Sequence, residues 1–543
     1  MPSTISDPDG ARSIGKAAAP DPAEVDICLR VLAQVQATDP DDPRWRAVHQ
    51  AVAQVHRAAK KSRKAARHAD RRRRDIESSA ASTRYRQPDP GPEPAPTPAQ
   101  DPDFSLAPDL TPAGASPATV GGRAPDEAGD ASVKVRRRLV GARRCYVCKA
   151  PYREMHSEYH LLCVDCAEEN QVRRYARCDL RGRRALVTGG RVKIGFQVAL
   201  KLLRDGAEVI VTTRFPRDAA RRFAAVPDSA DWLRRLHVHG VDLLDLPGVA
   251  ELLGSVHRRF DHLDILINNA AQTIRRPAAF HREVRAAEKL PLTGTAARVT
   301  VTGGACMLTD PAPSSLEASG PGPFTPVPPH LMSGPVSGPS ALDGATPEKP
   351  VTDGTVTSAR DSAWEVLFPA GRTDETGQPL DLRARNSWSL RLHEVDPAEW
   401  LEVQMVNSFA PFLLTSRLRG LLEASPWPDR YVVQVSAMEG SFSRENKTVR
   451  HPHTNMAKAS LNMMTRTAAA DFAASGIHMN SVDTGWVTDE RPHPDKTVQR
   501  EAGFRPPLDV IDGAARVYDP IVRGIGGERM SGLFLKDYRP VEW

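Results

Sequence analysis

The sequence predicts an α/β domain with a doubly wound parallel sheet over roughly the last two thirds of the chain. A short apolar strand at 184–188 runs into a glycine-rich turn and then a segment of helical periodicity at 196–204. Further apolar strands alternate with helical segments almost to the C-terminus. Two C-x-x-C pairs stand shortly before the first strand. We therefore expect the α/β domain to be preceded by a helical hairpin, a linker and a small cysteine module.

The composition limits how much of the chain can be packed core. Of 543 residues only 40% are hydrophobic, and 47 are proline, so one large domain with small appendages and disordered segments is expected. The net charge of +6 is modest for this length and points to no particular partner. No run of about 18 apolar residues and no signal-peptide pattern is found, so we expect a cytoplasmic protein that makes no membrane contact.

Residues 1–85 predict the helical hairpin. Apolar residues recur at helical spacing from Val25 to Val35, and a second helix starting at Pro43 carries Trp45, Val48 and Val55 on one face. Its far end is basic, with four consecutive arginines at 71–74. Contact with a nucleic acid or an acidic protein is one interpretation, and a solvated helix end is the other. The second is favoured because no aromatic residues interleave with the charge.

Two segments are too poor in large apolar residues to fold as core. Residues 86–135 are dominated by Pro, Asp, Ala and Gly and predict a disordered linker. A second Pro-, Gly- and Ser-rich stretch interrupts the α/β domain of 179–543, and we place this insertion at about 280–385.

Four cysteines within 136–178 predict a structural zinc site. Cys145 and Cys148 form one C-x-x-C pair, and Cys163 and Cys166 form another after 14 intervening residues. Two such pairs can complete a tetrahedron of thiolates around Zn²⁺, and a segment with so little apolar content needs a metal to fold. The alternative is four unligated thiols. The module either docks on the α/β domain or recruits a partner.

The turn after the strand at 184–188 has the composition of a phosphate site. Glycines occupy positions 189, 190 and 195, directly before a helix. A strand, a glycine-rich turn and a helix N-terminus together present backbone N–H groups and a dipole to a pyrophosphate. The sequence therefore predicts a dinucleotide site there.

At this turn the chain resembles the short-chain dehydrogenase/reductase family, whose pattern is T-G-x-x-x-G-x-G. Thr188, Gly189 and Gly195 match, and Lys193 stands where the middle glycine is expected. The lysine side chain crowds the phosphate approach, but its ammonium can pair with a phosphate oxygen. The resemblance implies a Rossmann-like fold in which Thr188, Gly189, Arg191, Ile194 and Gly195 bind the cofactor.

Three further landmarks of the family follow in order. Arg214 ends the second strand, where an NAD-selective site has an acid, and with Arg191 it favours the 2′-phosphate of NADP(H) over NAD(H); two surface arginines are the alternative. Val241-Asp242-Leu243 matches the adenine contact, and Asn268-Asn269-Ala270-Ala271 matches the N-N-A-G signature. The resemblance adds Asp242, Leu243, Asn268 and Ala270 to the cofactor contacts.

The catalytic part of the resemblance is incomplete. Asn407 and Lys458 match the family's Asn and Lys, and Thr484 stands beside the expected nicotinamide. Thr454, four residues before Lys458, replaces the catalytic Tyr, and Ala437 replaces the Ser. Lys458 is thus expected both to contact the cofactor ribose and to act in catalysis.

Two hypotheses account for the missing side chains. The first is an NADP-dependent oxidoreductase acting on an unidentified carbonyl or hydroxyl substrate, in which His453 or Glu439 replaces the Tyr. His453 alternatively only starts a helix. The second hypothesis is an inactive NADP(H)-binding sensor or scaffold that engages a partner through the zinc module. The family also implies a homo-oligomer, for which Met463, Met464 and Phe472 suit either an interface or a core.

Overall fold

A computed structural model describes residues 21–39, 41–86, 91–95, 137–304, 364–374, 376–445 and 447–543. The chain divides into two compact units, Met1–Glu77 and Ser78–Trp543. No helix within these ranges is long and apolar enough to cross a membrane.

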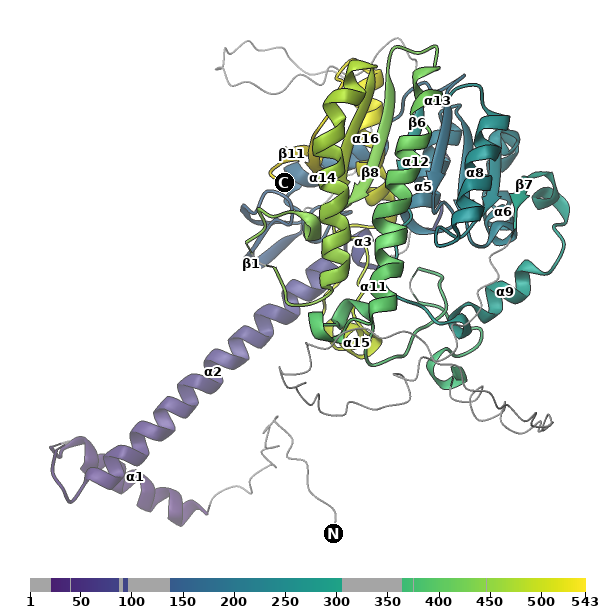
Figure 1. Ribbon diagram of the computed structural model, residues 1–543. Coiled ribbons are helices and arrows are strands. Elements are labelled where there is room, and N and C mark those ends of the chain that lie inside the picture. Colours follow the sequence, from purple (N-terminus) through teal and green to yellow (C-terminus); the bar gives the residue numbers. More distant parts are fainter. Residues whose placement is uncertain are drawn as a thin grey trace, which may run out of the picture. The chain divides into compact units, whose positions relative to one another are not determined.

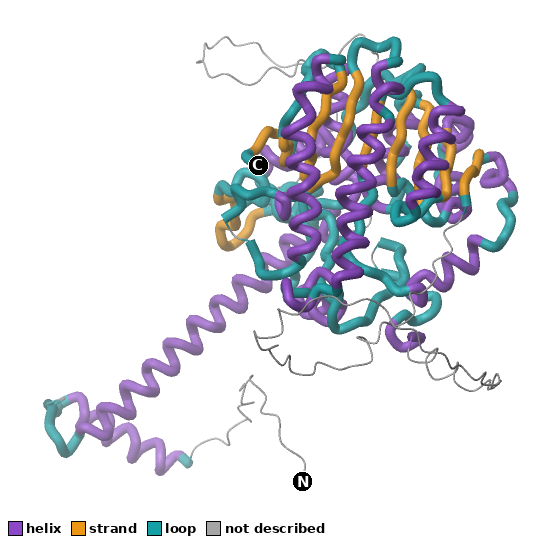
Figure 2. Tube along the Cα trace, viewed as in Figure 1, coloured by secondary structure: helices purple, strands orange, loops and turns teal. Residues whose placement is uncertain are grey.

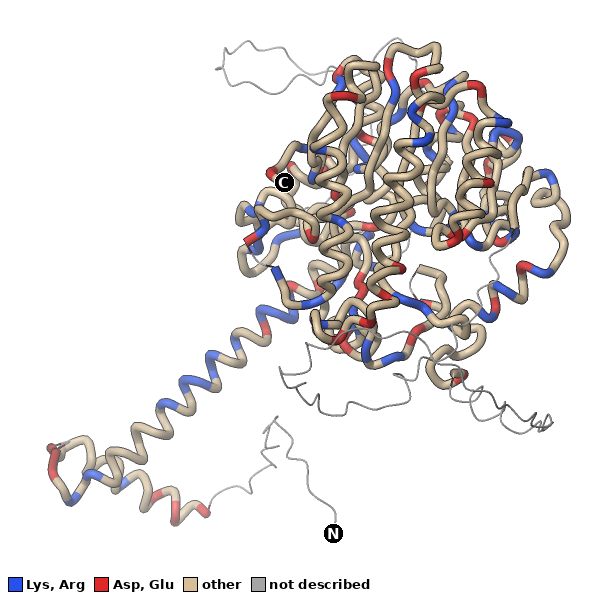
Figure 3. Tube along the Cα trace, viewed as in Figure 1, with Lys and Arg blue, Asp and Glu red and all other residues tan. Residues whose placement is uncertain are grey.

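The N-terminal unit contains two helices, α1 (Pro22–Gln36) and most of α2 (Arg46–Ala80). Asp21 caps α1 by accepting a hydrogen bond from Ala23 N, and a proline follows at the first helical position. Lys and Arg recur along α2 (Figure 3), but acids one turn away partly balance them. Asp70, for example, lies 2.5 Å from Arg73 and 3.2 Å from Arg74. Such pairs are typical of a solvated helix.

The large unit is built on a nine-stranded sheet (Figures 1 and 2). Its strands are β3 (Arg184–Thr188), β4 (Glu208–Thr213), β5 (Leu236–Gly240), β6 (Ile265–Asn268), β7 (Thr300–Gly303), β8 (Arg430–Ser436), β9 (Ile477–Asp483), β10 (Phe534–Lys536) and β11 (Arg539–Val541). Their spatial order is β11-β10-β9-β8-β6-β3-β4-β5-β7, and only β11 is antiparallel to its neighbour. The strand order reverses between β3 and β6, which is where such sheets bind ligands.

Helices cover both faces of this sheet, so the doubly wound prediction is confirmed. On one face α5 (Lys193–Arg204), α6 (Pro216–Ala224) and α16 (Val510–Ile525) bury apolar side chains against the strands. On the other face α8 (Leu246–Arg259), α12 (Ala410–Arg417), α13 (Arg419–Glu423) and α14 (Pro452–Ala474) do the same. The strands between the two edges, such as β3, β4, β6 and β8, are buried on both sides, which explains their nearly continuous apolar sequences.

Part of the predicted insertion belongs to the sheet. Residues 278–303 form two short 3₁₀ turns, the helix α9 (Arg282–Glu288) and the edge strand β7, which pairs with β5. The chain is described again from Trp364, whereas 305–363 lie outside the described residues. The sequence did not reveal β7 because its residues, Thr-Val-Thr-Gly, are few and mostly polar.

Most of the predicted linker, 87–90 and 96–135, lies outside the described residues, but 91–95 pack against α5. The carboxylate of Glu93 lies 2.8 Å from the ammonium of Lys201, and both side chains are buried. Gln197 accepts a hydrogen bond from Glu93 N and donates one to the carbonyl of Gly91. Both partners of such a buried pair must stay in place, because either charge buried alone would destabilise the fold.

The cysteine module consists of β1 (Arg138–Arg144), β2 (Pro151–Glu154) and α4 (Val164–Arg174). Strands β1 and β2 form a two-stranded antiparallel sheet. The module has a small core of its own, to which Leu508 and Val487 of the large α/β domain contribute. It therefore docks on that domain.

Candidate functional site

The turn after β3 is fastened to the end of β6 at the sheet's reversal point. The hydroxyl of Thr188 accepts hydrogen bonds from the backbone N–H groups of Asn269 and Ala270, both at 3.0 Å. The side chain of Asn269 donates in return to the carbonyls of Thr188 and Gly189. These four bonds hold the turn open toward the carboxyl edge of the sheet.

Two glycines of the turn are required by close packing. A Cβ on Gly195 would lie 2.3 Å from the carbonyl oxygen of Gly189 and 2.4 Å from the amide nitrogen of Asn269. Gly189 itself has φ of 69°, a conformation that favours glycine. No larger residue fits at position 195 without displacing the turn.

The helix after the turn presents free N–H groups to the carboxyl edge. Helix α5 starts at Lys193, and its N-cap, Val192, supplies no side-chain acceptor. The first amides of an α-helix have no partner within the helix, and with the helix dipole they attract an anion. The geometry thus fits a pyrophosphate.

Lys193 adopts a backbone conformation that normally belongs to glycine. Its φ is 54°, which costs a non-glycine residue about 1 kcal/mol. Its ammonium lies 3.5 Å from the carboxylate of Glu490, in the loop after β9. The side chain therefore points to this loop.

Two arginines converge on one aromatic ring beside the turn. The guanidinium carbons of Arg191 and Arg214 lie 5.3 and 5.7 Å from the ring centre of Phe215. Arg191 is also paired with Asp218 at 2.7 Å. Burial, followed by the charges of Arg214 and Arg191, lowers the pKa of nearby His281 to about 2. The region carries a positive field suited to a phosphate.

The other cofactor residues expected from the sequence lie at the same edge of the sheet. Asp242 accepts a hydrogen bond from Leu244 N and so shapes the turn after β5, and Leu243 is buried there. Ile194 packs near Gly513 of α16, and Thr484 is half-buried directly after β9. Asp242 and Leu243 follow β5, Thr484 follows β9, and Ile194 lies at the start of α5.

Of the two asparagines at the end of β6, Asn268, which was expected from the sequence, bonds to side chains of α12 and β8. The amide of Asn268 donates to Thr415 and Gln434 at 3.1 and 3.0 Å. Asn269, which the sequence analysis did not single out, holds the glycine turn instead. The only sequence signal for this role was the position of Asn269 next to Asn268 at the end of a strand, since adjacent residues of a strand point to opposite faces of the sheet.

Asn407 lies in a π-helical turn. The turn, η8 (Met405–Phe409), joins α11 (Pro397–Gln404) to α12. Asn407 is fully buried, accepts from Gln272 N at 2.6 Å and donates to Gln272 O at 3.0 Å. Such π turns are frequent at functional sites.

Lys458 and Glu439 lie close together at the end of β8. The ammonium of Lys458 is buried and donates to the carbonyl of Val435 at 2.6 Å. Burial lowers its pKa to about 8, and the charge of Glu439 partly offsets this effect. Glu439 is half-buried and is bound by Arg444 at 2.7 Å.

His453 and Thr454 are enclosed by neighbouring helices. The ring of His453 is 1% exposed, and its Nε2 lies 3.4 Å from the carboxylate of Glu399 on α11. The hydroxyl of Thr454 is buried without a hydrogen-bond partner among the described residues. Ala437 offers no polar group, and Ser436 faces the backbone of Lys458. The sequence did not indicate the partner of His453, because α11 is 50 residues away along the chain.

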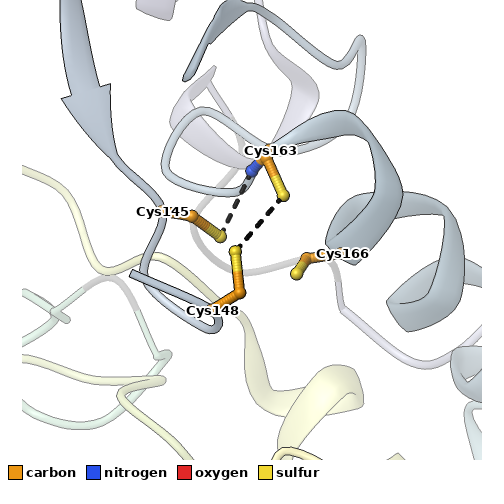
Figure 4. A group of neighbouring side chains, drawn as sticks. All are labelled: Cys145, Cys148, Cys163 and Cys166. Atoms are coloured by element: carbon orange, nitrogen blue, oxygen red, sulfur yellow. Dashed lines mark hydrogen bonds between the residues drawn. The ribbon is translucent and has the colours of Figure 1, made fainter. Parts of the chain in front are cut away.

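The four predicted cysteines form one cluster (Figure 4). Their sulfur atoms all lie within 4.8 Å of one another, and those of Cys148 and Cys163 are 3.7 Å apart. A tetrahedral zinc about 2.3 Å from each thiolate requires sulfurs about 3.8 Å apart. The sulfur of Cys145 also accepts a hydrogen bond from Cys163 N, as knuckle cysteines do. The site fits zinc in both donor type and spacing.

Buried polar contacts join the cysteine module to α16. Tyr159 donates to Asp512 at 2.8 Å, and Arg174 binds both Asp509 and Asp512 at 2.7 and 2.6 Å. Because one partner alone would leave a buried charge uncompensated, these contacts fix the position of the module.

One cysteine knuckle also touches the loop after β9. The hydroxyl of Tyr146, between the first two cysteines, accepts a hydrogen bond from Trp486 N at 2.9 Å. Trp486 is two residues beyond Thr484. The module therefore supports the loop that follows the expected nicotinamide contact.

Comparison with protein families finds two matching segments. Residues 183–301 match the short chain dehydrogenase model, and 384–501 match a model described as enoyl-(acyl carrier protein) reductase. The gap between them contains the insertion.

Two relatives illustrate the extent of the similarity. An uncharacterized protein of Acanthamoeba polyphaga mimivirus is 32% identical over 391 residues, covering 70% of this chain and 71% of that protein. Pig carbonyl reductase [NADPH] 1 is 34% identical over 115 residues, 21% of this chain. The chain spans only 39% of the pig enzyme's length.

Solved structures with a similar chain path include NADPH-bound carbonyl reductase from chicken fatty liver. It is 16% identical, covers 67% of this chain and 100% of its own, and has a TM-score of 0.38. A short chain dehydrogenase of Burkholderia cenocepacia in complex with NADP is 19% identical, covers 66% and 97%, and has a TM-score of 0.38.

Proposed function

Since the chain belongs to the short-chain dehydrogenase/reductase family, we propose that it binds NADP(H) and interconverts a carbonyl and a hydroxyl group on a small-molecule substrate. The observation that carries this proposal is the turn after β3, held open by Asn269 and too tight at Gly195 for any side chain. The amides at the start of α5 bind the pyrophosphate.

Arg214 selects NADP(H) over NAD(H) in this proposal. Arg191 is already paired with Asp218, whereas Arg214 has no ion pair among the described residues and contacts the rings of His281 at 3.5 Å and Phe215. The less neutralised guanidinium is the stronger partner for a 2′-phosphate. Arg191 contributes to the field and packs on Phe215.

Lys458 is the proposed acid and base. The bound cofactor supplies or accepts the hydride, so the chain must provide one proton to the substrate oxygen during reduction. A lysine whose pKa is about 8 can donate it near neutral pH. An ammonium has three donors, and its bond to Val435 leaves two. Thr454 is too weak an acid for this role.

Glu439 is the proposed tuning group, because its charge favours the protonated form of Lys458. His453, the other candidate from the sequence, faces Glu399 between α14 and α11. It is assigned to positioning the start of α14. Asn407 fixes the backbone of Gln272 at the mouth of the site.

The four cysteines bind one structural Zn²⁺ in this proposal. All four ligand positions are protein thiolates, so no position is left for a water or a substrate. The ion holds the knuckle that carries Tyr146 against the loop after β9. Its removal is expected to loosen this loop.

Self-association is proposed through the face formed by α11, α12 and α14. Leu401, Phe412 and Met463 on these helices are 58%, 52% and 55% exposed, as apolar side chains of an interface are before association. Phe472, by contrast, is buried in the core.

The test is turnover of a panel of aldehydes and ketones with NADPH, using zinc-loaded full-length protein and Lys458→Met. We expect the parent to consume NADPH with at least one carbonyl, with kcat depending on a group of pKa about 8, and Lys458→Met to show no turnover. Tight NADPH binding without any turnover would contradict the enzyme and favour the sensor. If His453→Ala abolished turnover while Lys458→Met stayed active, the role of the acid would pass to His453.

A further inference from the structure

A cavity of about 200 Å³ opens at the carboxyl edge of the sheet, outside the glycine turn. Three segments form it: Ile274 and Arg276 after β6, the return of the insertion at 372–386, and α15 (His493–Glu501) with the residues just before it. None of residues 188–195 lines it. The cavity is thus separate from the cradle assigned to the pyrophosphate.

The wall of this cavity is strongly cationic. Six lysine or arginine side chains and one histidine line it, against two carboxylates: Arg276, Arg372, Arg383, Arg491, Lys496, Arg500 and His493, against Asp374 and Asp381. A concave surface lined by one sign of charge concentrates ligands of the opposite sign.

Other groups already engage the two carboxylates. Asp381 pairs with both Arg276 and Arg383. One oxygen of Asp374 accepts hydrogen bonds from the backbone and hydroxyl of Thr376 and from Gln378 N. Arg491 is likewise paired, with Asp489 at 2.8 Å. The wall is thus a network of ion pairs in which basic side chains outnumber the carboxylates that line the cavity.

One of the arginines, Arg276, is mostly buried, with 20% of its side chain exposed. Burial lowers the pKa of Arg276 to about 10, an effect that Glu490 partly offsets and Arg383 reinforces. Arg276 and Arg383 share the single carboxylate of Asp381, so a second anion beside these two guanidinium groups would offset their remaining charge.

The cavity adjoins the cofactor turn through Glu490. This residue pairs with Lys193 at 3.5 Å, and its carbonyl accepts a hydrogen bond from Asn386, a residue of the cavity wall. The 2′-phosphate already has a site beside Phe215, on the other side of β3. The cationic cavity therefore suits a group that belongs to the substrate.

We propose that this cavity binds an anionic group of the substrate, a carboxylate or a phosphate ester, and so restricts the enzyme to acidic carbonyl compounds. The proposal rests on the proposed function, because it assigns the anion to the molecule that is reduced. The volume of the cavity suits one such anionic group rather than a long chain.

The test variant is Lys496→Gln/Arg500→Gln. The two residues stand four apart on α15 and share one side of the helix, and both are only half-buried. The control is Arg234→Gln/Arg258→Gln, which removes the same charge from exposed positions outside the cavity. Circular dichroism and NADPH affinity should match the parent in both proteins.

The first measurement is calorimetry of inorganic phosphate and of glutarate with protein saturated with NADP⁺. We expect one anion per chain, with affinity reduced about tenfold or more in the test variant and unchanged in the control. The affinity should also fall as salt is raised. Equal affinities in the test variant and the parent, or binding abolished by NADP⁺, would overturn the proposal.

The second measurement is turnover of three matched aldehydes: 4-formylbenzoate, 4-formylphenyl phosphate and the neutral methyl 4-formylbenzoate. We expect kcat/KM to be higher for one or both anionic aldehydes than for the ester. In the test variant this preference should be lost because the KM of the anionic aldehydes rises. The anionic aldehyde with the higher kcat/KM shows whether the cavity prefers a carboxylate or a phosphate ester. An ester turned over as well as both anions would refute the proposal.

Failure of the proposed function would look different. Protein that binds phosphate in this cavity but takes up no NADPH would contradict the oxidoreductase and remove the assignment to a substrate. Protein that binds NADPH but neither anion would contradict the cavity proposal alone.

Discussion

Replacing Lys458 by methionine should abolish turnover and yet stabilise the fold near neutral pH. The side chain is buried, and burial lowers its pKa from 10.5 to about 8. At about 1.4 kcal/mol per pH unit, this difference is a penalty of about 3 kcal/mol for holding the charged form in the folded protein. Methionine has a similar length but no charge. It forfeits the hydrogen bond to Val435, which contributes about 1 kcal/mol. The net gain at pH 7 is therefore about 2 kcal/mol.

The pH dependence of the difference in unfolding free energy distinguishes this charge effect from a change in packing alone. Between pH 8 and 10.5 the unfolded chain keeps the proton on Lys458 while the folded protein releases it. The unfolded state then binds more protons, so the stability of the parent rises with pH in this window. The variant lacks the group, and its advantage should shrink toward pH 10.5.

Urea unfolding followed by circular dichroism at pH 7, 8.5 and 10 measures the effect. Lys289→Met, at an exposed position, serves as the control and should show no such convergence. If Lys458→Met is less stable than the parent at pH 7, or if the difference stays constant with pH, the lysine is not held at a desolvated site and the reasoning is refuted.

Four other predictions follow from the described contacts. Arg214→Gln should weaken NADPH binding by roughly 10- to 100-fold, the worth of one charged hydrogen bond, while NADH binding is unchanged; an equal loss for both would contradict the role in selectivity. Cys148→Ser should reduce bound zinc from one per chain to none by elemental analysis and lower the melting temperature; retained zinc would show a different ligand set. Asp512→Asn removes a buried partner of Arg174 and should cost about 3–5 kcal/mol in unfolding experiments, whereas a change under 1 kcal/mol (about the worth of an exposed pair) would mean the module is only loosely docked. Phe412→Ser should shift the protein to a smaller species by light scattering, and an unchanged mass would remove the proposed interface.

The fold followed from local features of the sequence. The apolar strands and the glycine turn that leads into α5 determine the sheet and its reversal point, because residues close in the chain form each of these elements. The cysteine cluster was also local, since each knuckle is only four residues long. Strand β7 was missed because four residues, Thr300–Gly303, carry too little apolar pattern.

Long-range polar contacts could not be predicted. The bonds from Tyr159 and Arg174 to Asp512 connect residues more than 330 positions apart, and no periodicity encodes them. The same is true of Glu93, which the surrounding Pro-rich composition assigned to a linker and which packs against Lys201. The orientation of His453 toward Glu399 depends on how α14 sits against α11. Such contacts arise from tertiary packing.

The cradle for the dinucleotide is the central claim, and calorimetry with NADPH on zinc-loaded protein tests it most directly. We predict one NADPH bound per chain, weaker heat with NADH, and no heat for Gly195→Val, whose Cβ would collide with the carbonyl of Gly189. Folded, zinc-loaded parent protein that gives no heat with NADPH would contradict the claim.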